Sequence, residues 1–193
     1  MFDLVAADLA SVIPVPPNGN SEVIKVLAGH GLVVGLLCPE IEQLVKTAIL
    51  LQAPVASDLH FLLCVLRVLP ELERSHHLVG QLAAKASHIH AEDLSPRSRE
   101  LVGRMGSLAA GMFRRADDSW YLRDHSVAAV LAEHDTEMDE LHASLIAEVS
   151  SGRMPLPATI EMTLMYEHLS DHAVNIADQV IYVAGFGPSV VQR

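Results

Sequence analysis

Apolar side chains recur along most of the chain with the 3.6-residue period of an α-helix. The stripe is clear between Ser126 and about Val149, where one face carries Val127, Val130, Leu131, Met138, Leu141 and Leu145. Similar stripes predict helices over 41–51, 57–89, 97–121 and 159–183. The pattern from Ser21 to about Leu37 is also helical, but three glycines weaken it. Helices of this length joined by short turns are typical of antiparallel bundles, so the chain is expected to be all-α.

Prolines and small polar residues predict where these helices end. The segment PVPPNGN at 14–20 cannot continue a helix, so it is interpreted as a linker and the residues before it as loosely attached. Pro39 is expected to open a new helical run, and Pro70 to kink the long helix over 57–89. Ser95 and Pro96 are expected to cap and begin the helix that follows the midpoint turn.

Composition agrees with a helical protein and excludes some classes of binding partner. Half of the residues are apolar and only 4% are aromatic, which does not fit an all-β protein. A net charge of −11 argues against binding to nucleic acid or to an anionic membrane surface. Cys38 and Cys64 are too few for a disulfide framework, and no run approaches about 18 uncharged apolar residues. We therefore expect a cytoplasmic chain without direct membrane insertion.

An internal repeat relates the two halves of the chain. LPELERSHHLVGQLA at 69–83 and MYEHLSDHAVNIA at 165–177 share an acidic residue, three intervening positions, a polar residue and a small-apolar stripe. This similarity predicts two three-helix units in tandem, the first without much of its first helix. Such an incomplete unit would expose an apolar face, which predicts either a homodimer or coverage by residues 1–37.

The sequence places two carboxylate pairs on two consecutive predicted helices. Glu167 and Asp171 are four residues apart, as are Asp135 and Asp139, so each pair lies on one helix face. Four carboxylates on facing helices are a hard-ligand site for iron, manganese or magnesium, or for zinc with nearby imidazoles. The alternative is that these are surface acids of an acidic protein. Helical phase brings His142 close to Asp139, whereas His134, His168 and His172 point elsewhere.

The corresponding site in the first half is eroded. Glu73 is followed four residues later by His77, and the second acidic pair falls near Gly31 and Gly35. A full carboxylate site is not expected there, although Glu73 and His77 could hold a softer cation. His76 and His77 are otherwise interpreted either as solvated groups or as groups that hold a metal ligand in place without binding the metal.

Three long phrases resemble the PhoU family of phosphate-uptake regulators. They are LLQAPVASDLHFLLCVLRVLPELERSHHLVGQLA at 50–83, HDTEMDELHASLIAEV at 134–149 and YEHLSDHAVNIADQVIYVAGFG at 166–187. The similarity extends over about 39–187, while residues 1–38 do not resemble the family's first helix and a half.

The resemblance implies tandem, spectrin-like three-helix bundles whose acidic motifs bind metal clusters, commonly iron and sometimes zinc or another divalent ion. It predicts a divergent segment and linker over 1–20, a first repeat over 21–92 and a second over 93–193. The second repeat keeps the metal residues Asp135, Asp139, Glu167 and Asp171. The first keeps Glu73 and Asp58, with His77 and glycines in place of the other acids.

The resemblance also implies a function. It predicts a non-enzymatic, negatively acting adaptor that couples the ATPase of a phosphate ABC transporter to a sensor histidine kinase. An alternative is a metal-dependent enzyme with a carboxylate-bridged centre, but the sequence lacks the Glu-x-x-His pairs typical of di-iron carboxylate enzymes. Another alternative is a metal-free helical scaffold.

Overall fold

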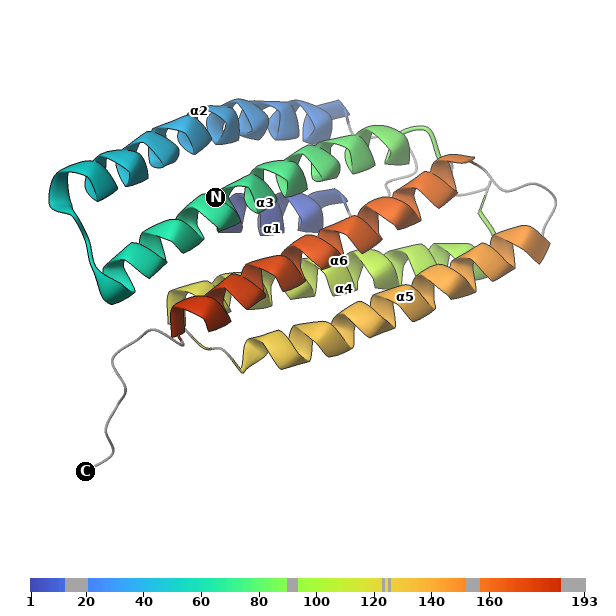
Figure 1. Cartoon of the computed structure of the whole chain (residues 1–193). Helices are drawn as coiled ribbons and strands as arrows, with labels where there is room; N and C mark the ends of the chain where they lie inside the picture. Colours follow the sequence, from blue (N-terminus) through green and yellow to red (C-terminus); the bar gives the residue numbers. More distant parts are fainter. Residues whose placement is uncertain (13–20, 90–93, 123, 125, 152–156, 185–193) are drawn as a thin grey trace.

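A computed structural model describes residues 1–12, 21–89, 94–122, 124, 126–151 and 157–184. These residues form six helices and no strand (Figure 1). The helices are α1 (Phe2–Val12), α2 (Ser21–Gln52), α3 (Ala56–Ala86), α4 (Pro96–Leu122), α5 (Val127–Ser151) and α6 (Pro157–Ala184). The predicted all-α bundle is therefore confirmed. The predicted linker at 14–20 lies outside the described residues, as does part of the midpoint turn.

Helix α1 is part of the core, so the expectation that the N-terminal residues are loosely attached is wrong. Its face bearing Val5, Leu9 and Val12 is almost fully buried against α3 and α4. The ring of Trp120 lies close to two phenylalanine rings, with a centroid distance of 6.0 Å to Phe2 and 5.8 Å to Phe61. Trp120, which the sequence suggests as a packing residue, therefore joins three helices. Burial of the apolar stripe fixes α1 despite the prolines that follow it.

Helix α2 continues through Pro39, although the sequence predicts a break there. Proline removes one backbone donor and crowds the carbonyl four residues earlier, which here belongs to Gly35. Both Gly35 and Pro39 lie on the exposed side of α2, so water can hydrate this carbonyl. On the adjacent side, Val34 and Cys38 pack with Leu69 of α3. Packing on one face and hydration on the other allow a single helix to pass the proline.

The start of α4 confirms the predicted cap. The Ser95 hydroxyl accepts a hydrogen bond from the Ser98 backbone amide at 3.0 Å, and Pro96 is the first residue of the helix. The same hydroxyl lies 2.7 Å from Glu148 Oε1 on α5 and donates to it. The cap thus fixes both the first turn of α4 and its position against α5.

Helices α4, α5 and α6 pack against one another as a three-helix bundle, and α3 packs along α6 to join the two halves. A single cluster of buried residues extends from α1 to α6. Tyr166, Phe113 and Leu169 are among its fully buried members. The α3–α6 contact sets the positions of α5 and α6 relative to the first half of the chain.

The outer face of α2 is not covered by any described part of the chain. Leu32 and Leu36 are 73% and 72% exposed, and Leu44, Leu50 and Leu51 are exposed as well. Helix α1 is 11 residues long and α2 is 32, so α1 covers only part of its length. The unpartnered apolar face expected from an incomplete first unit is therefore present, on the outside of α2.

Helix α2 is also the one described helix that is long and apolar enough to cross a membrane. A window of 18 residues in it has a mean hydropathy of 1.6 and is 17% buried. A membrane-spanning helix can contain a few charged residues, so this segment qualifies although no run of about 18 uncharged apolar residues exists. Length and composition of one helix near the N-terminus are weak evidence for a membrane span.

Candidate functional site

The four carboxylates predicted to form a metal site come from neighbouring helices of the second bundle. Asp135 and Asp139 lie on α5, while Glu167 and Asp171 lie on α6, and these two helices pack side by side (Figure 1). Next to these acids lies the buried core between the helices, which includes Met138, Leu169 and Ala173. The acids therefore border an apolar core.

Electrostatics indicate that the four acids are close to one another. Partial removal from water raises the pKa of Asp171, and the charges of Asp135, Glu167 and Asp139 raise it further. His168 acts in the opposite direction and lowers it. A carboxyl whose ionisation is opposed by three neighbouring carboxylates is in a site where a cation would relieve repulsion.

Two neighbouring side chains orient the acids. His142 on α5 places Nδ1 2.8 Å from Glu167 Oε2, so its partner is Glu167 rather than the expected Asp139. The fully buried Ser170 hydroxyl donates a short hydrogen bond to Asp135 Oδ1. His172 is turned away towards Ser75, whose Oγ is 2.9 Å from His172 Nδ1, in agreement with its predicted direction. Ser170 was missed by sequence reasoning because a buried serine leaves no pattern of its own.

The donor chemistry of this face suits a hard cation, since its carboxylate oxygens are accompanied by one imidazole. Within the described parts of the chain, no group of three or more His, Cys, Asp or Glu side chains is already arranged as a metal site. The hydrogen bond from Ser170 and the contact of His142 Nδ1 with Glu167 occupy two of the oxygens. Binding of a cation would therefore require these side chains to change rotamer, while the helices that carry them stay in place.

The matching face of the first bundle is hollow instead of acidic. A cavity of about 350 Å³ lies where the sequence predicted the eroded site. Glu73 and His77 are exposed at its edge, and His77 Nε2 lies 2.8 Å from Gln81 Nε2. The residues lining it are Gly31, Val34, Gly35, Glu73, Arg74, His76 and His77. Glu73 and His77 thus remain neighbours on one helix, with no third ligand assembled among the described residues.

His76 is buried, so the interpretation of this residue as a solvated group is wrong, while the alternative that it supports a metal ligand stays a prediction. It is 6% exposed, and its Nε2 lies 3.2 Å from Oδ2 of Asp8, itself 3% exposed. The other oxygen of Asp8 is 2.7 Å from His30 Nδ1. A Cβ on Gly31 would come within 3.3 Å of His76 Cε1, so glycine makes room for this ring.

Sequence reasoning missed this cluster of Asp8, His30 and His76, which joins α1, α2 and α3. A signal was available, because Asp8 lies between Val5, Leu9 and Val12 on the face that α1 buries. A carboxylate on a buried apolar face requires a partner. The identity of that partner depends on three separate helices.

A second acidic contact connects α1 to α4. Burial, followed by the charge of Asp3 and a hydrogen bond with it, raises the pKa of Asp117 from 3.8 to about 6. The folded chain therefore holds this proton more tightly than the unfolded chain does. Stability contributed by the protonated form is lost as the pH rises from about 4 to about 6.

The variant Asp117→Asn is expected to be more stable than the parent chain at pH 7.5, by about 1 kcal/mol after allowance for solvent screening. The gain should shrink as the pH falls through about 6, where the folded chain takes up the proton, and should disappear well below pH 4, where Asp117 is protonated in both states. Melting temperatures of the two proteins at several pH values measure this. The exposed neighbour variant Asp118→Asn is the control, and an equal gain from it would attribute the effect to net charge alone.

The sequence of this chain is similar to those of known proteins from one family. The PhoU domain family matches residues 102–180. PhoU homolog 1 of Mycobacterium leprae, a phosphate-specific transport system accessory protein, is 30% identical over 140 residues, covering 69% of this chain and 63% of that protein. PhoU homolog 2 of Mycobacterium tuberculosis is 27% identical over 157 residues, covering 78% of this chain and 74% of that protein.

The whole fold is also shared with solved proteins. PhoU from Pseudomonas aeruginosa superposes with a TM-score of 0.86 at 22% identity, covering 95% of this chain and 91% of that one. The PhoU regulatory protein from Streptococcus pneumoniae gives 0.81 at 20% identity, covering 95% and 89%. The superposition includes most of the N-terminal region in which the sequence alone showed no resemblance.

Proposed function

Because the chain belongs to the PhoU family, we propose that it acts as an accessory regulator of phosphate-specific transport. The observation that carries this proposal is the relationship to curated accessory proteins of that system, together with the PhoU domain match over 102–180. The chain spans 63% of the first of these relatives. Its role is binding rather than catalysis, in agreement with the accessory function for which those relatives are named.

The finer proposal concerns partners. The regulator acts negatively in the cytoplasm, coupling the ATPase of a phosphate ABC transporter to a sensor histidine kinase. Such coupling requires a surface that binds one state of a partner more tightly than the other. The two free and buried thiols, Cys38 and Cys64, are compatible with a reducing compartment.

A deletion experiment tests this function. Removal of the gene from its host is expected to raise phosphate uptake and the expression of a phosphate-starvation reporter in phosphate-rich medium. Re-expression of the chain should restore both to the parental level. Unchanged uptake and reporter activity in the deletion strain would refute a negative regulatory role.

We also propose that Asp135, Asp139, Glu167 and Asp171 bind a metal, most readily iron, with zinc or another divalent ion as alternatives. The charges of Asp135, Glu167 and Asp139, which oppose the ionisation of Asp171, support the proposal. His142 is positioned to participate by releasing Glu167. When bound, the cation neutralises the cluster and fixes α5 against α6. Glu73 and His77 would supply at most a weaker site in the first bundle.

A homodimer is proposed through the outer face of α2, where Leu32, Leu36 and Leu44 are exposed. Exposed apolar surface on the order of several hundred Å² is typical of an interface. The parent chain is expected to sediment as a dimer at micromolar concentration and the double variant Leu32→Glu/Leu36→Glu as a monomer. Leu122→Glu, at a residue that is 76% exposed at the end of α4, is the control. A monomeric parent chain would exclude this dimer.

A further inference from the structure

The outer face of α4 is positively charged in an otherwise acidic protein. Residues 96–115 contain five of the chain's 13 basic side chains and one of its 24 acidic ones, Glu100. The five arginines are all exposed, at positions 97, 99, 104, 114 and 115. Since the chain as a whole has a net charge of −11, this concentration of arginines is a local reversal of charge.

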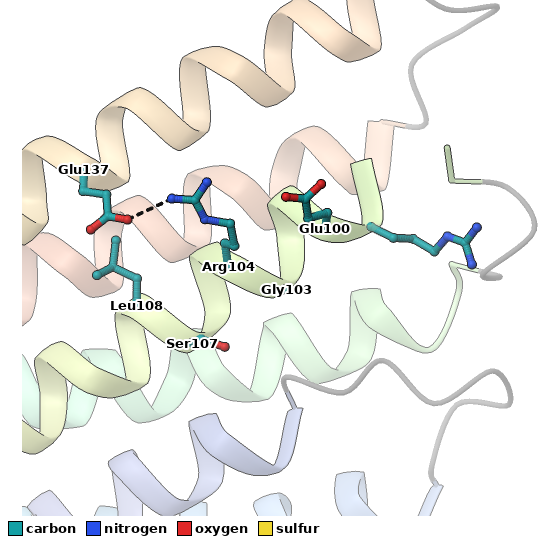
Figure 2. A pocket seen from close by; sticks show the side chains of 7 residues that line it. Glu100, Gly103, Arg104, Ser107, Leu108 and Glu137 are labelled. Carbon is teal, nitrogen blue, oxygen red and sulfur yellow. Dashed lines mark hydrogen bonds and ion pairs between the residues drawn. The ribbon is translucent and has the colours of Figure 1, made fainter. Parts of the chain in front are cut away.

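A groove of about 670 Å³ follows this face between α4 and α5. Figure 2 shows Gly103 and Ser107 on α4, with Leu108 and the Arg104–Glu137 pair beside them. Arg104 donates to Glu137 Oε1 at 3.1 Å, which demonstrates that an arginine of this groove can hold a carboxylate from a neighbouring helix. Arg99 lines the groove as well.

The glycines of this face are not explained by packing within the described chain. A Cβ at Gly103 or Gly111 would meet no atom within 4 Å, and neither residue has a positive φ. Glycine weakens a helix interior relative to alanine, so both positions carry a cost without a compensating internal contact. Gly103, Ser107 and Gly111 are four residues apart and form a smooth line along one side of α4.

The arginines border this side of the helix on both flanks. Measured around the helix axis from Ser107, Arg99 lies on one flank and Arg104 and Arg115 lie on the other. Arg114 and Glu100 lie nearly in line with Ser107, at the two ends of the small-residue line, and Glu100 is already paired with Arg97 at 3.0 Å. A helix resting on the small residues would therefore have an arginine on each flank within about 24 Å. Two copies of this positive face would repel each other, so a second α4 is a poor occupant.

We propose that this groove, together with the face of α4 that continues from it to Gly111, docks an acidic helix of a partner protein, with its backbone close to Gly103, Ser107 and Gly111 and its carboxylates paired with the flanking arginines. This inference assigns a partner-binding surface to the proposed regulator, and in that respect it rests on the proposed function. It is independent of the metal cluster, which lies on α5 and α6 and not on α4.

The test uses a fluorescein-labelled, end-capped peptide of about 20 residues, long enough to be helical in isolation. In this peptide, one face of the helix consists of alanines and has glutamates on both sides. A second peptide has lysine in place of every glutamate. Fluorescence anisotropy with the purified full chain is expected to detect binding of the glutamate peptide alone, weakening at least tenfold between 50 and 300 mM salt. Equal binding of the lysine peptide, or no binding of the glutamate peptide, would overturn the proposal.

Variants separate the charges of the groove from its shape. Arg99→Glu/Arg115→Glu is expected to weaken peptide binding at least tenfold, whereas Lys25→Glu on the exposed side of α2 should leave it unchanged. Gly103→Leu/Gly111→Leu is expected to weaken binding at least fivefold. Gly80→Leu is its matched control, since Gly80 is in α3 and a Cβ there also meets open space.

Substitution of either glycine of this face of α4 by alanine is expected to change stability and peptide binding in opposite directions. Gly103→Ala and Gly111→Ala are expected to raise the melting temperature, because alanine favours the helix, and yet to weaken peptide binding. Binding that is unaffected by the groove variants would overturn the proposal, as would equal affinity for a DNA oligonucleotide of the same charge. Because only purified components are used, failure here is distinguishable from failure of the uptake experiment.

Discussion

Replacing Asp8 with alanine is expected to lower the free energy of unfolding by about 3 kcal/mol, because the change removes a buried carboxylate that contacts two histidines of neighbouring helices. Asp8 is 3% exposed and joins His30 of α2, at 2.7 Å, to His76 of α3, at 3.2 Å. Without the carboxylate, the buried His76 ring loses this charged partner, and α1 loses its polar contact with the other two helices of its bundle. Denaturant unfolding followed by circular dichroism measures the loss.

An exposed acid of the same bundle provides the control. Glu40 lies on the exposed side of α2, the helix that carries His30, so Glu40→Ala also removes one negative charge from this bundle. Its effect is expected to stay within about 0.5 kcal/mol. Asp8→Asn, which retains the shape and one acceptor oxygen, should lose less stability than Asp8→Ala. Equal losses for Glu40→Ala and Asp8→Ala would show that the cluster contributes nothing specific.

The second large effect concerns metal. The chain purified from cells grown with iron is expected to contain metal, iron or zinc, at about one equivalent or more. The quadruple variant of Asp135, Asp139, Glu167 and Asp171 to alanine should contain none. A chelator should lower the melting temperature of the parent chain and leave that of the variant unchanged, because a ligand that binds only the folded chain stabilises it. Elemental analysis and thermal melts provide both readings.

A control of equal charge distinguishes ligation from electrostatics. Alanine at Glu133, Glu140, Glu161 and Asp178, four exposed acids on the same two helices, removes the same number of carboxylates elsewhere. This control should retain the metal. Without metal, the variant of the cluster should be at least as stable as the parent, since like-charge repulsion is removed. If the parent and both variants are metal-free and melt alike, the chain is a metal-free scaffold and the metal proposal is wrong.

The helices were predictable because their apolar period is a local property of the chain. The stripes over 126–149 and 159–183 correspond to α5 and α6 with shifts of one or two residues at their ends. The Ser95 cap was predictable for the same reason, since its bond spans only three residues. Pro39 misled the prediction because proline indicates a local cost, whereas the packing of Val34 and Cys38 on Leu69 that offsets it is not local.

The acidic face of α5 and α6 was predictable as two pairs, because residues four apart share a helix face wherever that helix lies. The partner of His142 was not, since the sequence suggested Asp139 on the same helix and the fold supplied Glu167 from the next one. Similarly, Asp8 indicated only that a buried carboxylate needs a partner. The choice of His30 and His76 follows from how three helices meet.

For this protein, the sequence alone determined most of the helical segments after the first linker, the apolar side of each and the acids that share a face, since these depend on spacing within one helix. The tertiary structure decided that α1 belongs to the core, that His76 is buried and that α2 keeps an uncovered outer face. It also decided where the groove of α4 lies relative to Glu137. These features depend on contacts between residues distant in the sequence, which the period of one helix cannot specify.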